Sequence, residues 1–189
     1  MNHIIATLLF AVVTSRTSAG GVTIALPEGW RRLDAAEAKA LKPELKPQNK
    51  LQRRLAQEPE GRLPLIAMKH DVPGSIAAGV QVFLNPVPAE MRYASSIELA
   101  RVIAFASVAA FQGKYDASPH ETTVGGLPAA EWVAHYTLVE TGGSHAMKMR
   151  GVIVAVKDKF YLVGYSAPES DSADFELFET MVRSIQFNK

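Results

Sequence analysis

The chain has 189 residues, of which 48% are hydrophobic and 21% are charged, and its formal net charge is +1 at pH 7. This length and composition suit one compact globular domain with a sizeable core. The nearly balanced charge gives no indication of nucleic acid or acidic lipid as a partner. No cysteine is present, which excludes disulfides, thiolate metal sites, a cysteine nucleophile and a lipidated cysteine.

An apolar run over residues 4–13 opens the chain, and the small residues Thr17, Ser18 and Ala19 follow it. The run is far shorter than the roughly 20 residues that cross a bilayer as a helix. We therefore interpret residues 1–19 as a secretory signal peptide, and we expect an exported, periplasmic protein. The run is preceded by no Lys or Arg, so an uncleaved anchor stays open as the alternative.

The first half of the remaining chain begins with an alternating segment, 22–26, that predicts a short strand. A turn then leads to Trp30. Asp34 and Glu37 have the spacing of a capping pair for a helix over residues 35–42, which two prolines then break.

A hairpin and a long helix are predicted next. The segments 65–71 and 79–85 have the composition of paired strands around a Pro-Gly turn. Ser95 and Glu98 form a capping box that opens a helix, and Gly113 ends it. The interior of this helix is nearly all apolar, so we expect it to be buried against a sheet, with a partner surface as a further use.

The last third of the chain predicts three antiparallel strands in succession, over 131–139, 146–156 and 160–166, closed by one helix. Apolar residues occur on both faces of these strands, so we expect both sides of the sheet to be covered. Asp171 or Ser172 is the expected cap of the helix. Its apolar stripe consists of Phe175, Phe178, Met181, Val182 and Ile185.

The catalytic motifs that the chain suggests are incomplete. Ser166 lies in a Gly-x-Ser-x-Pro sequence, where Pro168 replaces the second glycine of a nucleophile elbow, and no histidine follows it. His120 opens a His-Glu-x-x sequence, but Val124 stands where a zinc site needs its second histidine. We therefore assign no catalytic residue, no cofactor and no metal ligand.

Basic residues are concentrated between residues 31 and 54, where eight basic side chains accompany three acidic ones. Such a concentration indicates either a docking face for an anionic partner or a solvated basic surface. If it is a docking face, its candidate contact residues are Arg31, Arg32, Arg53 and Arg54.

Several short motifs together resemble the PsbP-like (DcrB-like) families. They are Leu26-Pro27-x-Gly29-Trp30, Val124-x-Gly126-x-Pro128-Ala129, Phe178 and Ser184-Ile185-x-Phe187. The resemblance implies an α+β fold, an α/β/α sandwich whose mainly antiparallel central sheet is flanked by helices. It also implies accessory work, since relatives assist the oxygen-evolving complex, bind a small GTPase or serve in the bacterial envelope. It carries over no functional residue.

From these observations we expect residues 20–189 to form a single domain of an exported, non-enzymatic binding or accessory protein. We expect it to act through protein–protein contacts, with another envelope protein as partner. Two alternatives stay open. One is an exported hydrolase or metal-dependent enzyme whose site assembles only in the fold, and the other is a carrier of an apolar ligand.

Overall fold

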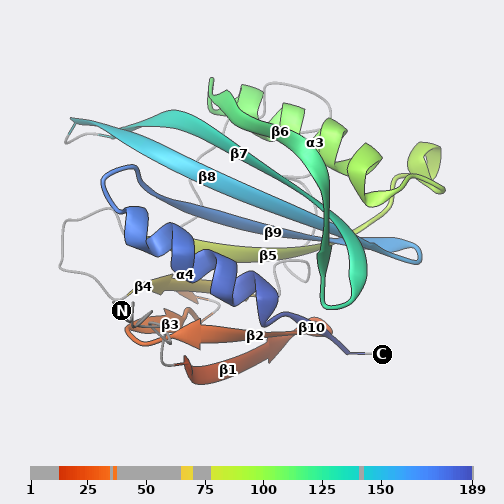
Figure 1. Cartoon of the computed structure of the whole chain (residues 1–189), viewed down its shortest axis with the longest axis horizontal. Helices are drawn as coiled ribbons and strands as arrows, with labels where there is room; N and C mark the ends of the chain where they lie inside the picture. The colour runs from red at the N-terminus through yellow and green to blue at the C-terminus, as the bar shows by residue number, and fades with distance from the viewer. Residues whose placement is uncertain (1–12, 35, 38–64, 70–77, 141–142, 189) are drawn as a thin grey trace, which may run out of the picture.

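A computed structural model describes residues 13–34, 36–37, 65–69, 78–140 and 143–188 (Figure 1). Two α-helices, one short 3-10 helix and ten strands occur in this part of the chain. In chain order they are β1 (Val13–Ala19), β2 (Val22–Pro27), β3 (Trp30–Arg32), β4 (Leu65–Lys69), β5 (Gly79–Pro86), η2 (Ala89–Met91), α3 (Ser96–Ala110), β6 (Lys114–Val124), β7 (Leu127–Glu140), β8 (Gly143–Val156), β9 (Lys159–Pro168), α4 (Ser172–Arg183) and β10 (Gln186–Phe187).

Seven strands form an antiparallel sheet in the order β3-β4-β5-β9-β8-β7-β6. The predicted hairpin corresponds to β4 and β5, and the three predicted strands correspond to β7, β8 and β9. The meander has a fourth strand, β6, which was not predicted from the sequence. Gly125 and Gly126 make the turn from β6 to β7, with φ angles of 57° and 78° that favour glycine.

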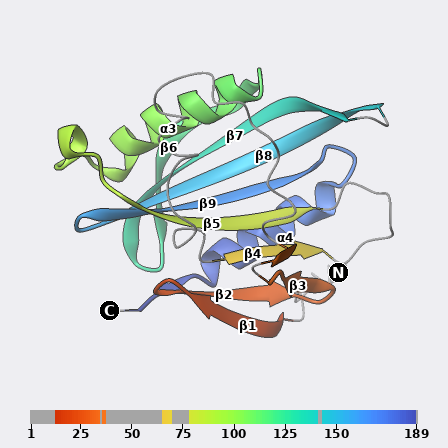
Figure 2. The ribbon, with the colours of Figure 1, turned by 180° about the vertical axis from the view of Figure 1, so that it is seen from behind.

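The remaining three strands form a smaller sheet in the order β1-β2-β10. Helix α4 contacts both β2 of this sheet and β9 of the large one, whereas α3 contacts β6, β7 and β8. The two views in Figure 1 and Figure 2 show α3 and α4 on opposite faces of the large sheet. This arrangement confirms the predicted α+β sandwich with a mainly antiparallel central sheet.

Each face of the large sheet buries its own hydrophobic cluster. The cluster under α4 also takes in β2, and its fully buried members include Ile24, Leu26, Tyr165, Phe178 and Met181. Four of the five predicted stripe residues of α4 are buried, and Phe175 packs against the cluster, so the predicted amphipathic helix is confirmed.

The cluster under α3 is built around Trp132, which lies across Gly151 of the neighbouring strand. Leu99, Ile103 and Val108 of α3 complete it. Glycine is required at position 151 because the indole ring occupies the space that a Cβ atom would need.

The N-terminal helix caps agree with the predictions in two cases of three. Asp34 and Glu37 exchange the expected capping hydrogen bonds, although most of the predicted helix 35–42 lies outside the described residues. Ser95 caps α3 through a complete capping box. Asp171 is the N-cap residue of α4 but its side chain makes no capping bond, and it pairs instead with Lys69 Nζ at 3.1 Å.

Helix α3 is less buried than its composition predicts. Phe105 is 69% exposed and Val102 is 43% exposed, because they lie on the side of the helix that faces away from the sheet. Within the described segments, no helix combines the length and the hydrophobicity needed to cross a membrane.

The predicted signal peptide overlaps the described structure at β1. Residues 1–12 lie outside the described part, but residues 13–19 form a strand that pairs with β2. The prediction of cleavage after Ala19 is not tested by this pairing.

Candidate functional site

Charged side chains gather on the part of the large sheet that α4 leaves uncovered. Alternate residues of β7 and β8 point toward the side of α4, which places Glu131, His135, Lys148 and Arg150 on one surface. The edge strand β6, the turn before α4 and α4 itself add further charges. We call this surface the charged face; it consists of Asp116, His120, Glu131, His135, Lys148, Arg150, Glu169, Glu179 and Arg183.

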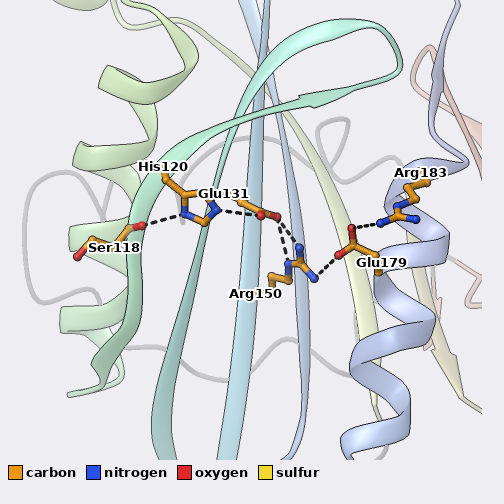
Figure 3. Close-up of polar contacts among 6 residues, drawn as sticks. All are labelled: Ser118, His120, Glu131, Arg150, Glu179 and Arg183. Atoms are coloured by element: carbon orange, nitrogen blue, oxygen red, sulfur yellow. Dashed lines mark hydrogen bonds and ion pairs between the residues drawn. The ribbon is translucent and has the colours of Figure 1, made fainter.

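A row of hydrogen bonds and ion pairs crosses the charged face from β6 to α4 (Figure 3). His120 Nε2 lies 3.0 Å from Glu131 Oε1, and Arg150 Nη2 donates to Glu131 Oε2 at 2.7 Å. Arg150 Nη1 reaches Glu179 Oε2 at 2.6 Å, and Arg183 Nη2 lies 3.1 Å from Glu179 Oε1. The row thereby links side chains of four elements, β6, β7, β8 and α4.

Arg150 is the shielded centre of the row. Its side chain is 16% exposed and that of Glu131 is 15% exposed. Burial opposes the charge, but the hydrogen bonds and charges of Glu131 and Glu179 together raise the pKa of Arg150. Burial likewise acts to raise the pKa of Glu179, and Arg150 with Arg183 outweighs it and lowers that pKa. The guanidinium also lies over the ring of Phe178, with 5.6 Å from Cζ to the ring centroid.

A second group of contacts is centred on His135. Its Nδ1 lies 2.6 Å from Glu169 Oε1, and its Nε2 lies 3.3 Å from Asp116 Oδ2. Lys148 Nζ also lies 3.3 Å from Asp116 Oδ2 and stands over the ring of Phe175. Hydrogen bonds from Lys148 and His135 lower the pKa of Asp116.

The charged face therefore presents ordered donors and acceptors at the surface. Its centre is compensated internally, whereas Arg183, which is 77% exposed, and the half-exposed His120 and Asp116 can bind groups from outside. In the described part of the chain, no three His, Asp or Glu side chains are arranged to hold a metal ion. The arrangement suits recognition of a polar surface.

The four predicted arginines are only partly described. Arg31 and Arg32 are exposed residues of β3, and Arg31 Nη1 lies 2.8 Å from Glu37 Oε1. Arg32 Nη1 donates to the Ser18 carbonyl oxygen at 3.4 Å. Arg53 and Arg54 lie outside the described residues, so a common face for all four stays a prediction.

The residues of the rejected catalytic motifs have structural contacts. Ser166 lies within β9, and its hydroxyl is 2.5 Å from the hydroxyl of Tyr136, whose pKa is raised by burial. His120 lies in β6 and contacts Glu131 and the Ser118 carbonyl oxygen.

The charged face itself was not predicted from the sequence. The alternation of Lys148 and Arg150 along one strand was visible there as a signal. Their partners come from three other elements, which only the register and the docking of α4 bring together.

Comparison with known proteins identifies the fold. No family model and no curated protein sequence matches the chain. A cyanobacterial PsbP (CyanoP) from Synechocystis sp. PCC 6803 aligns at 12% identity and a TM-score of 0.52, over 92% of this chain and 91% of that one. The Ran-binding protein Mog1p of Saccharomyces cerevisiae aligns at 11% identity and a TM-score of 0.51, over 89% and 90%.

Two further structures come from other bacteria. LpqN, involved in cell envelope biogenesis of Mycobacterium tuberculosis, aligns at 10% identity and a TM-score of 0.50, over 93% of this chain and 85% of that one. The chain also spans 46% of the length of a Bacteroides thetaiotaomicron protein, at 10% identity and a TM-score of 0.49. At such identities the likeness concerns the fold, and the chain has the α+β fold shared by PsbP-like and Mog1-like proteins.

Proposed function

We propose that this chain is an exported binding or accessory protein that acts through protein–protein contacts in the bacterial periplasm, without catalysis. The charged face is the proposed contact surface. The observation that carries the proposal is the row of side-chain contacts, whose shielded centre positions the exposed His120 at one end and the exposed Arg183 at the other. Charges that are already held in place give a protein surface specificity for its partner. Their side chains also lose little conformational entropy on binding.

The fold of the chain supports this function by analogy alone. PsbP-like and Mog1-like proteins include one described as Ran-binding and one described as involved in cell envelope biogenesis. Proteins of the same fold bind different partners, so we infer the partner from the chemistry of the charged face. It is a folded envelope protein whose polar surface carries both signs of charge.

The test is photocrosslinking of the exported protein in intact cells, followed by mass spectrometry of the captured partner. The variant Asp116→Asn, His120→Gln, Arg183→Gln replaces the exposed groups that can bind from outside and leaves the Arg150 centre in place. We expect it to reduce capture at least tenfold. A second variant changes Arg31, Arg32, Arg53 and Arg54 to Gln and tests the alternative contact face that the sequence predicts.

Three results would overturn the proposal. Capture that depends on the four arginines alone would move the contact surface to them. Turnover of an ester or phosphoester panel, or stoichiometric metal by elemental analysis, would make the protein an enzyme. A ligand mass retained in native mass spectrometry would make it a carrier.

A further inference from the structure

Strand β1 covers one edge of β2, and the predicted signal cleavage site lies at the last residue of β1. The pairing extends from Val13 opposite Pro27 to Ala19 opposite Val22. Cleavage after Ala19 would remove the whole strand from the mature protein. Within the described residues, the other edge of β2 is paired with a strand at two positions, both in β10.

We propose that export opens the outer edge of β2, and that the mature protein uses this edge to bind an extended segment of a partner protein. The segment adds as an antiparallel strand in the place of β1. This inference rests on the proposed exported contact function, and it adds a second surface and the kind of segment that fits it.

The hydrogen bonds on the β10 side of β2 show which of its backbone groups form the open edge. The Gly21 carbonyl oxygen accepts from Asn188 N at 2.8 Å, and Ala25 N donates to Ser184 Oγ at 2.8 Å. Both partners come from the carboxyl-terminal end of the chain, on the side of β10. Backbone groups of successive strand residues point to opposite edges. The intervening residues, Val22, Ile24 and Leu26, therefore present their N–H and C=O groups to β1.

Strand β2 is held in place without β1. The side chains of Val22, Ile24 and Leu26 are fully buried in the cluster under α4. The turn that precedes β2 is also anchored, since Tyr161 donates its hydroxyl to the Gly20 carbonyl oxygen at 3.1 Å. The edge therefore keeps its shape when the strand that covers it leaves.

Among the described side chains of β1, those of residues 15–19, few attach the strand to its neighbours. Ser18 Oγ lies 2.7 Å from Thr23 Oγ1, and Ala19 packs against the edge of the core. Ser15 and Thr17 stand opposite the buried Leu26 and Ile24 but offer small polar side chains there.

A segment with apolar residues at the positions of Ser15 and Thr17 would bury more apolar area on the same edge. A partner segment that alternates apolar and polar residues, without proline, is therefore expected to fit the edge better than β1 does. This composition defines the occupant that we propose.

The first measurement is the intact mass of the protein exported from a bacterial host that expresses the full chain. We expect a mature protein that begins at Gly20. A mature protein that retains residues 13–19 would overturn the proposal, because β1 would still cover the edge.

The second measurement is binding of labelled peptides to the exported protein by fluorescence anisotropy. The peptide of residues 13–19 should bind, and its Ser15→Val, Thr17→Val form should bind about tenfold more tightly. The same apolar peptide with proline at the Thr17 position is the control. It lacks an N–H that faces Ile24 and is expected not to bind.

A reversible staple tests where the peptide binds. Ser18→Cys with Thr23→Cys places the only two cysteines of the chain opposite each other, so oxidation holds β1 on β2 after cleavage. The oxidised protein should not bind the peptide, and reduction followed by removal of the released strand should restore binding. Equal peptide binding by the oxidised and the reduced protein would overturn the proposed occupant. A native dimer that the peptide dissociates would also overturn it.

The two proposals fail separately. Peptide binding without any captured envelope protein counts against the proposed function. Capture through the charged face without peptide binding counts against the open edge alone.

Discussion

At the scale of single residues, two paired glycines of the large sheet have opposite surroundings. Gly151 of β8 stands opposite Gly164 of β9. A Cβ atom at Gly151 would overlap the indole ring of Trp132, whereas a Cβ atom at Gly164 would meet no atom within 4 Å. Substitutions at these two glycines therefore distinguish the effect of packing on stability from the effect of replacing a glycine in a strand.

Gly151→Ala is expected to lower the free energy of unfolding by about 3 kcal/mol, because Trp132 is buried and has no room to yield. Gly164→Ala is the matched control. It is expected to change stability by less than about 1 kcal/mol, since it adds a methyl group in open space. Urea denaturation of both variants measures the difference, and equal losses would contradict the packing of Trp132 on Gly151.

Arg150 allows a test of the shielded ion pair. Arg150→Met leaves the Glu131 carboxylate largely buried without its charged partner, and we expect a loss of about 2 kcal/mol. Adding Glu131→Gln should recover at least half of that loss. Arg183→Met, at the exposed end of the row, should cost less than about 0.5 kcal/mol. A double variant less stable than Arg150→Met would contradict this account.

The sequence pattern shows on which side of its strand Arg150 lies, but it does not identify Glu131 as the partner of Arg150. Alternation alone places Lys148 and Arg150 on one side of a strand. Glu131 pairs with Arg150 across the ladder but stands opposite Val152, so the contact runs diagonally and depends on the register of β7 and β8. Glu179 joins only because α4 docks beside them. Neither relation is contained in the spacing of residues along the chain.

At the scale of elements, the start of α3 combines a cap with an attachment to the sheet. Ser95 forms the capping box with Glu98. The adjacent Ser96 is buried, donates its hydroxyl to the Pro128 carbonyl oxygen at 2.9 Å and accepts from Ala155 N at 3.1 Å. Ser96 thereby fixes the helix to two strands of the sheet.

Ser96→Ala should cost more than Ser95→Ala, about 2 against about 1 kcal/mol, because it removes two part-buried hydrogen bonds to the sheet. Ser95→Asp preserves the cap and serves as the control. Hydrogen exchange adds a local readout, since the Ala155 amide should lose protection in Ser96→Ala alone. Equal exchange of that amide in the two alanine variants would contradict the attachment.

Strand β6 shows why the sequence predicts some elements and misses others. The predicted strands β7, β8 and β9 have apolar residues on buried faces, and α4 has an apolar stripe. Strand β6 is exposed along most of its length, contains Pro119 and has two register shifts against β7. Its pairing, and not its hydrophobic pattern, makes it a strand, so alternation gave no signal.

At the scale of the whole molecule, β6 and β2 differ in what prevents a further strand from pairing with them. The polar composition, proline and irregular register of β6 make the outer edge of the large sheet a poor template for another strand. The backbone of β2 has no such protection and is covered instead by β1. An edge covered by a strand that processing is expected to remove is the natural place for an added strand.

Acid stability gives the last prediction for the whole domain. The pKa values of Asp116 and Glu179 are lowered in the folded state, the first by hydrogen bonds from Lys148 and His135 and the second, against burial, by Arg150 and Arg183. A carboxyl group with a lowered folded pKa stabilises the fold above its unfolded pKa, and this stability is lost as pH falls through the folded value. Stability should therefore decline below about pH 4.5.

Glu179→Gln isolates one of these groups. Because the Glu179 side chain is 37% exposed, solvent limits its contribution to less than about 1 kcal/mol. The variant should be less stable than the parent protein at pH 7, and the difference should shrink as pH falls through the lowered pKa of Glu179, because the parent carboxyl group then also becomes neutral. Glu176→Gln, one turn away on the exposed side of α4, is the control and should follow the parent over the same pH range. A stability difference for Glu179→Gln that stays constant from pH 7 to pH 3 would show that lost packing, and not charge, is what the substitution removes.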